Sequence, residues 1–237
     1  MNITYCKDYQ SMSLQAGLTL ITEIEKKKDL LLCASTGNSP TGLYKELEIK
    51  SLEEKEFFQY LRIIKLDEWG GVPPDHPSTC EQYLRKKLVI PLDISPVNYI
   101  SFLSDPPDPS GECMRIQSEL DRQGPIDVCI LGLGRNGHLG LNEPGEPFDS
   151  QCHVAKLTEI SLGHSMLGEM DSHPAYGLTL GLKDILSSAL ILLLVSGKNK
   201  TPVLGEFLQE KANEALPASC LWSHQNVECF INQSDVD

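Results

Sequence analysis

Apolar residues along this chain gather into runs of six to nine positions that polar stretches separate. Within the runs the apolar residues, many of them branched, are nearly continuous and do not alternate with polar ones. This pattern is typical of strands that are buried on both faces of a parallel sheet. The predicted strands lie in segments 29–35, 61–68, 97–103, 126–134, 189–197 and 227–232.

Helix-like stretches separate these runs. The predicted helices are Ser11–Lys28, Pro40–Ile49, Gly111–Gln123 and Pro202–Ala215. Strands that alternate with helices predict an α/β fold with a doubly wound, mostly parallel sheet and helices on both faces. Six or so strands fit one domain, and neither a linker nor a repeat interrupts the chain. We therefore interpret residues 1–237 as a single domain.

The bulk composition restricts the class of protein. Of the 237 residues, 41% are hydrophobic and 22% charged, which allows a substantial core and argues against a disordered chain. The formal net charge of −13 argues against a nucleic-acid partner, and no apolar stretch is long enough to span a membrane. The N-terminus lacks a signal-peptide run and the eight cysteines form no C-x-x-C pair, so we expect reduced, structural thiols in a cytoplasmic protein.

In a doubly wound sheet, ligands bind beyond the carboxyl ends of the strands, so the residues that follow each apolar run are functional candidates. The first such group is Thr36, Gly37, Asn38 and Ser39. With Ser39 as N-cap and Pro40 at the first helical position, a helix would begin here, and its free amide groups suit a phosphate. The lysine of a nucleotide-binding P-loop is missing. An ordinary capped turn is the alternative.

Residues 131–145, LGLGRNGHLGLNEPG, carry the G-x-G-x-x-G spacing of dinucleotide-binding loops at Gly132, Gly134 and Gly137. That fingerprint requires a helix after the glycines and an acidic residue about 20 positions later. Further glycines and prolines disfavour such a helix here, and with it a nicotinamide site. The segment then reads as a loop that approaches a ligand and presents His138 and Glu143, a pair in which the carboxylate can fix the imidazole tautomer. A purely structural histidine is the alternative.

Two further strand ends carry charged residues. Asp67 and Glu68 close one run, and because adjacent side chains point in different directions, one carboxylate could face the crevice as a general base. After another run, Lys198 and Lys200 precede a helix start, where a cation beside the amide groups would hold an anion. Solvated surface charges are the alternative in both places. Together the strand ends predict proton transfer on a small phosphorylated substrate, without a metal cluster.

The motifs LDEW, GLGRNGHLGLNEPG, YGLTLGL and SGKNK resemble those of the glucosamine-6-phosphate deaminase (isomerase) family. The similarity runs from about Leu31 nearly to the C-terminus and is greatest to the galactosamine-6-phosphate deaminase/isomerase branch. It implies a modified Rossmann-like fold, no cofactor, and conversion of an amino-sugar phosphate aldose to a ketose phosphate with release of ammonia. The implied partner is this small molecule, and the resemblance allows a homo-oligomer.

The resemblance assigns roles position by position. Asp67 matches the base that moves a proton between C2 and C1, His138 the residue that assists ring opening, and Glu143 its support. The phosphate-binding positions match Thr36, Gly37, Asn38, Ser39 and Lys200.

Two positions depart from the glucosamine-type pattern. Asn136 replaces an aspartate two residues before the histidine, and since an amide carries no charge we expect a less basic imidazole, which Asn136 can still orient. The family's phosphate-binding arginine has no counterpart in segment 157–170, where His164 is the nearest substitute. Both changes weaken the case for glucosamine-6-phosphate and leave its C4 epimer, galactosamine-6-phosphate, as the first choice.

Three other functions stay open behind this one. They are a glucosamine-6-phosphate deaminase, a 6-phosphogluconolactonase, which shares the Gly–His core, and a non-catalytic sugar-phosphate sensor. A sensor would normally carry a helix-turn-helix segment, and the region before Leu30 contains no basic recognition helix.

Overall fold

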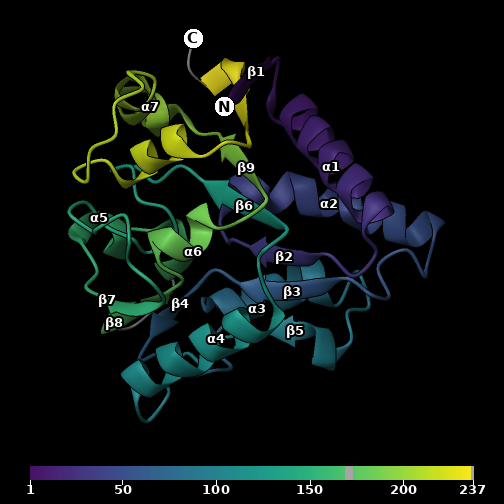
Figure 1. Ribbon diagram of the computed structural model, residues 1–237, viewed down its shortest axis with the longest axis horizontal. Helices are drawn as coiled ribbons and strands as arrows, with labels where there is room; N and C mark the ends of the chain where they lie inside the picture. Colours follow the sequence, from purple (N-terminus) through teal and green to yellow (C-terminus); the bar gives the residue numbers. More distant parts are fainter. Residues whose placement is uncertain (169–172, 236–237) are drawn as a thin grey trace.

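A central sheet of seven parallel strands organises the molecule, which a computed structural model describes for residues 1–168 and 173–235. The strand order is β1-β10-β9-β6-β2-β3-β5, and helices cover both faces (Figure 1). The predicted α/β fold is thereby confirmed. The strands are β1 (Asn2–Cys6), β2 (Leu31–Ala34), β3 (Arg62–Lys65), β5 (Tyr99–Ile100), β6 (Val128–Gly132), β9 (Leu190–Val195) and β10 (Val227–Asn232).

The central strands bury side chains on both faces, which explains their continuous apolar runs. In β2, Leu31 and Cys33 belong to one core, whereas Leu32 and Ala34 belong to the core on the opposite face. The helices α1 (Tyr9–Lys26), α2 (Asn38–Glu53) and α3 (Cys80–Leu84) pack on the Leu32 side. The helices α4 (Pro109–Gln123), α6 (Leu182–Leu186) and α7 (Thr201–Phe207) pack on the Leu31 side.

A second, antiparallel sheet of three strands lies beside the first. It consists of β4 (Asp67–Gly70), β8 (Tyr176–Thr179) and β7 (His153–Ala155), with the short α5 (Glu159–Leu162) following β7. The prediction of one strand over 61–68 is therefore wrong. The chain leaves the main sheet at Leu66, whose N–H still donates to the carbonyl of Ala34 at 3.0 Å, and then pairs with β8.

Other boundaries also differ from the predictions. The helix expected over Pro202–Ala215 ends at Phe207, and Glu210 has a φ of 60°, a left-handed conformation that no helix continues. The strand expected over 97–103 has only two residues, Tyr99–Ile100. Strands β1, β7 and β8 were not predicted because they are short or lie at a sheet edge, without a continuous apolar run.

The order of the strands places a crevice beside β2 and β6. From β2 the chain continues to β3 and β5 on one side, whereas β6 leads to β9 and β10 on the other. The loops that follow β2 and β6 therefore diverge, and this topological switch point is where open α/β sheets bind ligands.

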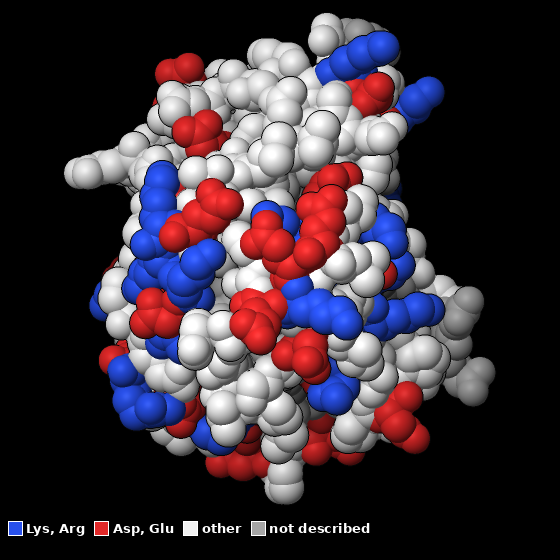
Figure 2. All heavy atoms as spheres, turned by 90° about the vertical axis from the view of Figure 1, so that its right-hand side faces the viewer, with Lys and Arg blue, Asp and Glu red and all other residues white. Residues whose placement is uncertain are grey.

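The surface and the cysteines agree with the composition. All eight cysteines are free thiols, seven of them buried. No helix within the described ranges is long and apolar enough to cross a membrane. On the face drawn in Figure 2, acidic and basic side chains are interspersed and form no continuous basic stripe.

Candidate active site

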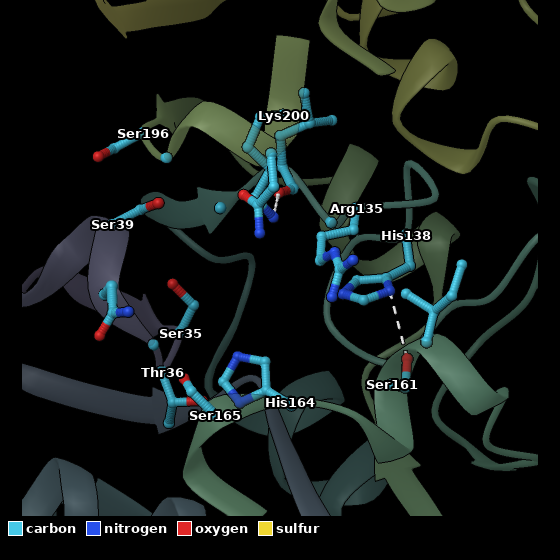
Figure 3. Close-up of a pocket in the computed structure, with 18 of the residues that line it drawn as sticks. Ser35, Thr36, Ser39, Arg135, His138, Ser161, His164, Ser165, Ser196 and Lys200 are labelled. Atoms are coloured by element: carbon cyan, nitrogen blue, oxygen red, sulfur yellow. Dashed lines mark hydrogen bonds between the residues drawn. The ribbon is translucent and has the colours of Figure 1, made fainter. Parts of the chain in front are cut away.

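A cavity of about 900 Å³ opens at the switch point. Its walls come from the segments at the ends of β2, β3, β6, β9 and β10, together with Tyr9 of α1 and the residues around α5. In Figure 3, Ser35, Thr36 and Ser39 lie on one wall, Arg135, His138 and Ser161 on the opposite wall, and Lys200 and His164 between them. The structure thus brings residues from seven separate segments to one space.

The N-terminus of α2 forms the first wall. Helix α2 begins at Asn38, two residues earlier than predicted, and Gly37 is its N-cap with a φ of 99°. The prediction of Ser39 as N-cap is wrong, because Ser39 lies in the first turn. No side chain of a described residue caps this end of α2, so its first amide groups are available to an anion.

Three tyrosine hydroxyls fix the orientation of this loop. They donate to the carbonyl groups of the loop at 2.6–2.7 Å, as Tyr44 to Ser35, Tyr83 to Gly37 and Tyr9 to Asn38. Because the carbonyl and the N–H of one trans peptide unit point in opposite directions, the next amide groups in the chain face away from the tyrosines. The residues that carry those amide groups, Thr36, Asn38 and Ser39, line the cavity.

Asp67 and Glu68 point in opposite directions, as adjacent strand residues must. Asp67 lines the cavity, whereas Glu68 is fully buried behind it. The carboxylate of Glu68 accepts hydrogen bonds from the backbone N–H groups of Trp69, Cys80 and Glu81 at 2.8–2.9 Å. It also pairs with the fully buried Lys65 at 2.6 Å. Glu68 therefore anchors β4 to α3, and with it the position of Asp67.

Asp67 has the environment of a general base. Its side chain is buried, and Oδ1 has no hydrogen-bond partner among the described residues. Burial and, secondly, the charge of Glu68 raise the pKa of Asp67 to about 7, against an opposing effect of Lys65. A carboxyl that titrates near neutral pH can both take up and release a proton there. Ser35 Oγ and Trp69 Nε1, also cavity residues, are likewise buried and unpartnered within the described ranges.

His138 lines the cavity opposite the α2 wall and contacts Glu143, which is not part of the lining. The imidazole Nδ1 lies 3.7 Å from Glu143 Oε2 and 3.4 Å from the hydroxyl of Ser161. Ser161 also donates to Glu143 Oε1. Burial raises the pKa of Glu143, but the contacts with His138, Ser161 and Asn136 outweigh this and lower it to about 2. Glu143 is therefore a permanent negative charge beside the imidazole.

Asn136 reaches the imidazole only indirectly. Its amide Nδ2 donates to Glu143 Oε2 at 2.8 Å, and its Oδ1 accepts the backbone N–H of His138 at 3.3 Å. The expectation that Asn136 orients the ring by its own hydrogen bond is thus replaced by a contact through Glu143.

The glycines of the G-x-G-x-x-G segment serve this cluster. A Cβ at Gly134 would lie 2.3 Å from Cδ2 of His138, so only glycine lets the ring lie against the loop. Gly137 has a φ of 81°, and a Cβ there would lie 2.3 Å from Leu216. Close approach and a left-handed turn explain the two glycines, and no regular helix follows them before α5.

Lys200 and His164 complete the cavity. The Lys200 ammonium donates to the carbonyl of Leu133 at 2.5 Å, and burial, together with the charge of Arg135, lowers its pKa to about 8. Burial, with the charges of His138 and Lys200, lowers the pKa of His164 to about 4. His164, whose ring centroid lies 6.0 Å from that of Trp69 at a tilt of 44°, is therefore neutral at pH 7 and cannot replace an arginine's charge. Lys198 is exposed at the rim.

Sequence reasoning missed Ser161, Arg135 and the three tyrosines. Serine and tyrosine side chains carry no local signal for contacts that span between 9 and 46 positions of the chain, as these do. The described ranges contain no group of three or more His, Cys, Asp or Glu side chains arranged to hold a metal ion.

Known proteins are similar to this chain in sequence and in fold. Residues 10–230 match the family of glucosamine-6-phosphate isomerases/6-phosphogluconolactonase. The chain belongs to this family. AgaI of Escherichia coli (strain K12), which carries a provisional deaminase name, is 39% identical over 226 residues, 95% of this chain and 90% of AgaI. Glucosamine-6-phosphate deaminase 1 of Bacillus subtilis (strain 168) is 34% identical over 235 residues, 98% of this chain and 97% of that protein.

The solved structures of the family agree. A structure described as a monomeric glucosamine-6-phosphate deaminase superposes with a TM-score of 0.95 at 33% identity, over 99% of this chain and 98% of its own. The 6-phosphogluconolactonase of Trypanosoma brucei has a TM-score of 0.77 at 21% identity, over 99% and 97%, a likeness of fold alone. The predictions of the family, of the fold and of a sugar-phosphate deaminase/isomerase enzyme are confirmed.

Proposed function

We propose that this protein is a hexosamine-6-phosphate deaminase/isomerase that converts galactosamine-6-phosphate to tagatose-6-phosphate and ammonia. One observation carries the proposal: the unpartnered, buried Oδ1 of Asp67 shares a cavity with the His138–Glu143 pair and with the uncapped N-terminus of α2. A base, a proton relay and an anion cradle are the three elements that this reaction needs.

Ring opening is the first step, and we assign it to His138. The proton of the C1 hydroxyl leaves and the ring oxygen gains one, so that the ring C–O bond breaks and an aldehyde forms. An imidazole that contacts Glu143 and Ser161 through Nδ1 keeps Nε2 for this transfer.

Proton transfer between C2 and C1 is assigned to Asp67. The new aldehyde makes the C2 hydrogen acidic, so a carboxylate with a pKa of about 7 can take it while the C1 oxygen gains a proton, and can then deliver it to C1 while the amine nitrogen loses one. The imine then left at C2 takes up one water and releases one ammonia, which gives the ketose. The amide groups of Thr36, Asn38 and Ser39 hold the phosphate together with Lys200. Because this fixes the substrate relative to Asp67, it can lower the activation barrier by several kcal/mol.

The choice of the C4 epimer rests on sequence. The motifs LDEW and GLGRNGHLGLNEPGE resemble the galactosamine branch, and Asn136 stands where glucosamine-type enzymes carry aspartate. The glucosamine-6-phosphate deaminase of Bacillus subtilis is 34% identical and AgaI is 39% identical. Glucosamine-6-phosphate is the second candidate substrate.

One substrate panel tests the proposal. Galactosamine-6-phosphate, glucosamine-6-phosphate, their N-acetyl forms and 6-phosphogluconolactone are each assayed for ammonia, ketose phosphate and acid. We expect ammonia and tagatose-6-phosphate at the highest kcat/KM from galactosamine-6-phosphate. A higher kcat/KM for glucosamine-6-phosphate would reverse the epimer, acid without ammonia would identify a lactonase, and binding without turnover would identify a sensor.

A further inference from the structure

Arg135 differs from the other arginines of the chain in having neither an ion pair nor a hydrogen bond to any described residue. The chain contains five arginines. Arg85, Arg115 and Arg122 each form an ion pair with a glutamate on their own helical segment, and Arg62 donates to two backbone carbonyls. Arg135 forms no ion pair or hydrogen bond with any residue of the described ranges 1–168 and 173–235.

The position of Arg135 explains why this charge matters. It follows Gly134 in the loop after β6, is exposed, and lines the cavity. Figure 3 shows Arg135 projecting from the same loop as His138 toward the cavity, with Lys200 above and, opposite, Ser35 and Thr36 of the loop after β2 and Ser39 of α2.

The cavity holds its positive charges close together without neutralising them. After burial, the charge of Arg135 is the second cause of the low pKa of Lys200, and the charges of His138 and Lys200 contribute to the low pKa of His164. Asp235 also lines the cavity beside the loop after β9, and its Oδ2 accepts hydrogen bonds from Asn232, Ser196 and Gly197 but forms no ion pair with Arg135 or Lys200. Unpaired cations that repel one another, in a chain of net charge −13, indicate a site that an anion completes.

We infer that Arg135 is a substrate-binding residue whose guanidinium group binds the phosphate together with Lys200 and the amide groups of α2. This inference rests on the proposed function for the identity of the sugar, but not for the phosphate. A guanidinium group stays charged at every working pH and can present two N–H groups to two phosphate oxygens, whereas Lys200 loses charge near pH 8. His164 adds a neutral hydrogen-bonding group at most.

Calorimetry with inorganic phosphate tests the inference directly. Arg135→Met removes the charge and keeps most of the apolar stem, and because the side chain is exposed, the variant should fold. Arg122→Met, an exposed arginine on α4 outside the cavity, is the matched control. We expect phosphate affinity to fall about 10- to 100-fold in Arg135→Met, to recover in part in Arg135→Lys, and to stay unchanged in Arg122→Met.

Kinetics with the two amino-sugar phosphates distinguish binding from catalysis. In Arg135→Met we expect KM to rise by the same factor while kcat stays within about threefold. Equal phosphate affinity in wild type and Arg135→Met would overturn the inference. A fall in kcat without a rise in KM would also overturn it, since the guanidinium group would then act on His138. If the wild type releases no ammonia from any substrate, the proposed function is wrong, but the phosphate titration still tests the role of Arg135. If the wild type binds no phosphate at millimolar concentration, the role of Arg135 is overturned.

Discussion

Two carboxylates at one cavity, Asp67 in its lining and Glu143 in contact with the lining residue His138, show how surroundings decide chemistry. Asp67 is buried with one oxygen unpartnered and with Glu68 behind it, and its pKa rises to about 7. Glu143 is also buried, but it accepts hydrogen bonds from Asn136 and Ser161 and contacts His138, so its pKa falls to about 2. Groups whose pKa values are pushed apart in this way suit different roles. Asp67 can exchange a proton near neutral pH, whereas Glu143 can only hold a charge beside the imidazole.

The largest expected effect is a loss of turnover when Asp67 is replaced. In Asp67→Asn we expect kcat to fall by about 10²- to 10⁴-fold, because the amide cannot take the C2 proton, while substrate binding changes little. Steady-state ammonia release and calorimetry measure the two quantities. Asp75→Asn, an exposed position eight residues away, is the control. Near-normal turnover in Asp67→Asn would show that another group is the base.

Replacement of Glu143 should slow a different step. In Glu143→Gln we expect kcat to fall by about 100-fold, because His138 loses the charge that supports it during ring opening. With substrate deuterated at C2, the isotope effect on kcat should then decrease, since ring opening precedes C2–H cleavage. Glu146→Gln, a loop residue near His153, is the control. An undiminished isotope effect in Glu143→Gln would place both carboxylates in the same step.

The pH dependence of stability should have opposite signs for the two groups. The pKa of Asp67 is raised on folding, so its ionisation opposes the folded state progressively between about pH 4 and pH 7. Asp67→Asn should therefore have a higher Tm than the wild type above pH 7, and this gain should disappear near pH 4. Scanning calorimetry across this range measures it, and a constant difference would contradict the raised pKa.

The corresponding effect of Glu143 lies at lower pH. Its pKa is lowered on folding, so its contribution to stability is complete above about pH 4.5 and is lost as the pH falls toward 2. Glu143→Gln should have a lower Tm than the wild type at neutral pH and a similar Tm near pH 2. An equal Tm for the two proteins at pH 7 would show that the hydrogen bonds of Glu143 do not favour its charged form.

The smallest expected effect belongs to Ser161. Ser161→Ala removes one hydrogen bond to Glu143 and a contact with His138, and we expect kcat to fall by about 3- to 10-fold. The acid limb of the stability profile should move to higher pH, because the pKa of Glu143 rises. Ser165→Ala, a cavity serine in the 3₁₀ turn after α5, serves as control. If kcat and the loss of stability at low pH are both unchanged in Ser161→Ala, then Asn136, and not Ser161, helps to lower the pKa of Glu143.

The strand ends were predictable because they depend on a local rule. Near-continuous apolar runs identify strands of a parallel sheet, and all carboxyl ends of such strands meet at one edge. Ser39, Asp67, His138 and Lys200 follow four different runs, and all four line the cavity. The same rule could not predict that the run ending at Asp67 leaves the main sheet, because the pairing of β4 with β8 depends on a strand more than 100 residues away.

By itself, the sequence determined the parallel sheet, its loops and the residue types that those loops carry, since apolar pattern, glycine and proline act over a few neighbouring positions. Only the tertiary structure decided the state of each group. The pKa of Asp67 is about 7 because the surrounding core buries it and the charge of Glu68 repels its own, and Glu143 stays charged because His138 and Ser161 contact it. The unpaired charge of Arg135 is likewise a property of the assembled cavity. Burial and electrostatic fields are sums over atoms brought together from distant parts of the chain, so no local stretch of sequence contains them.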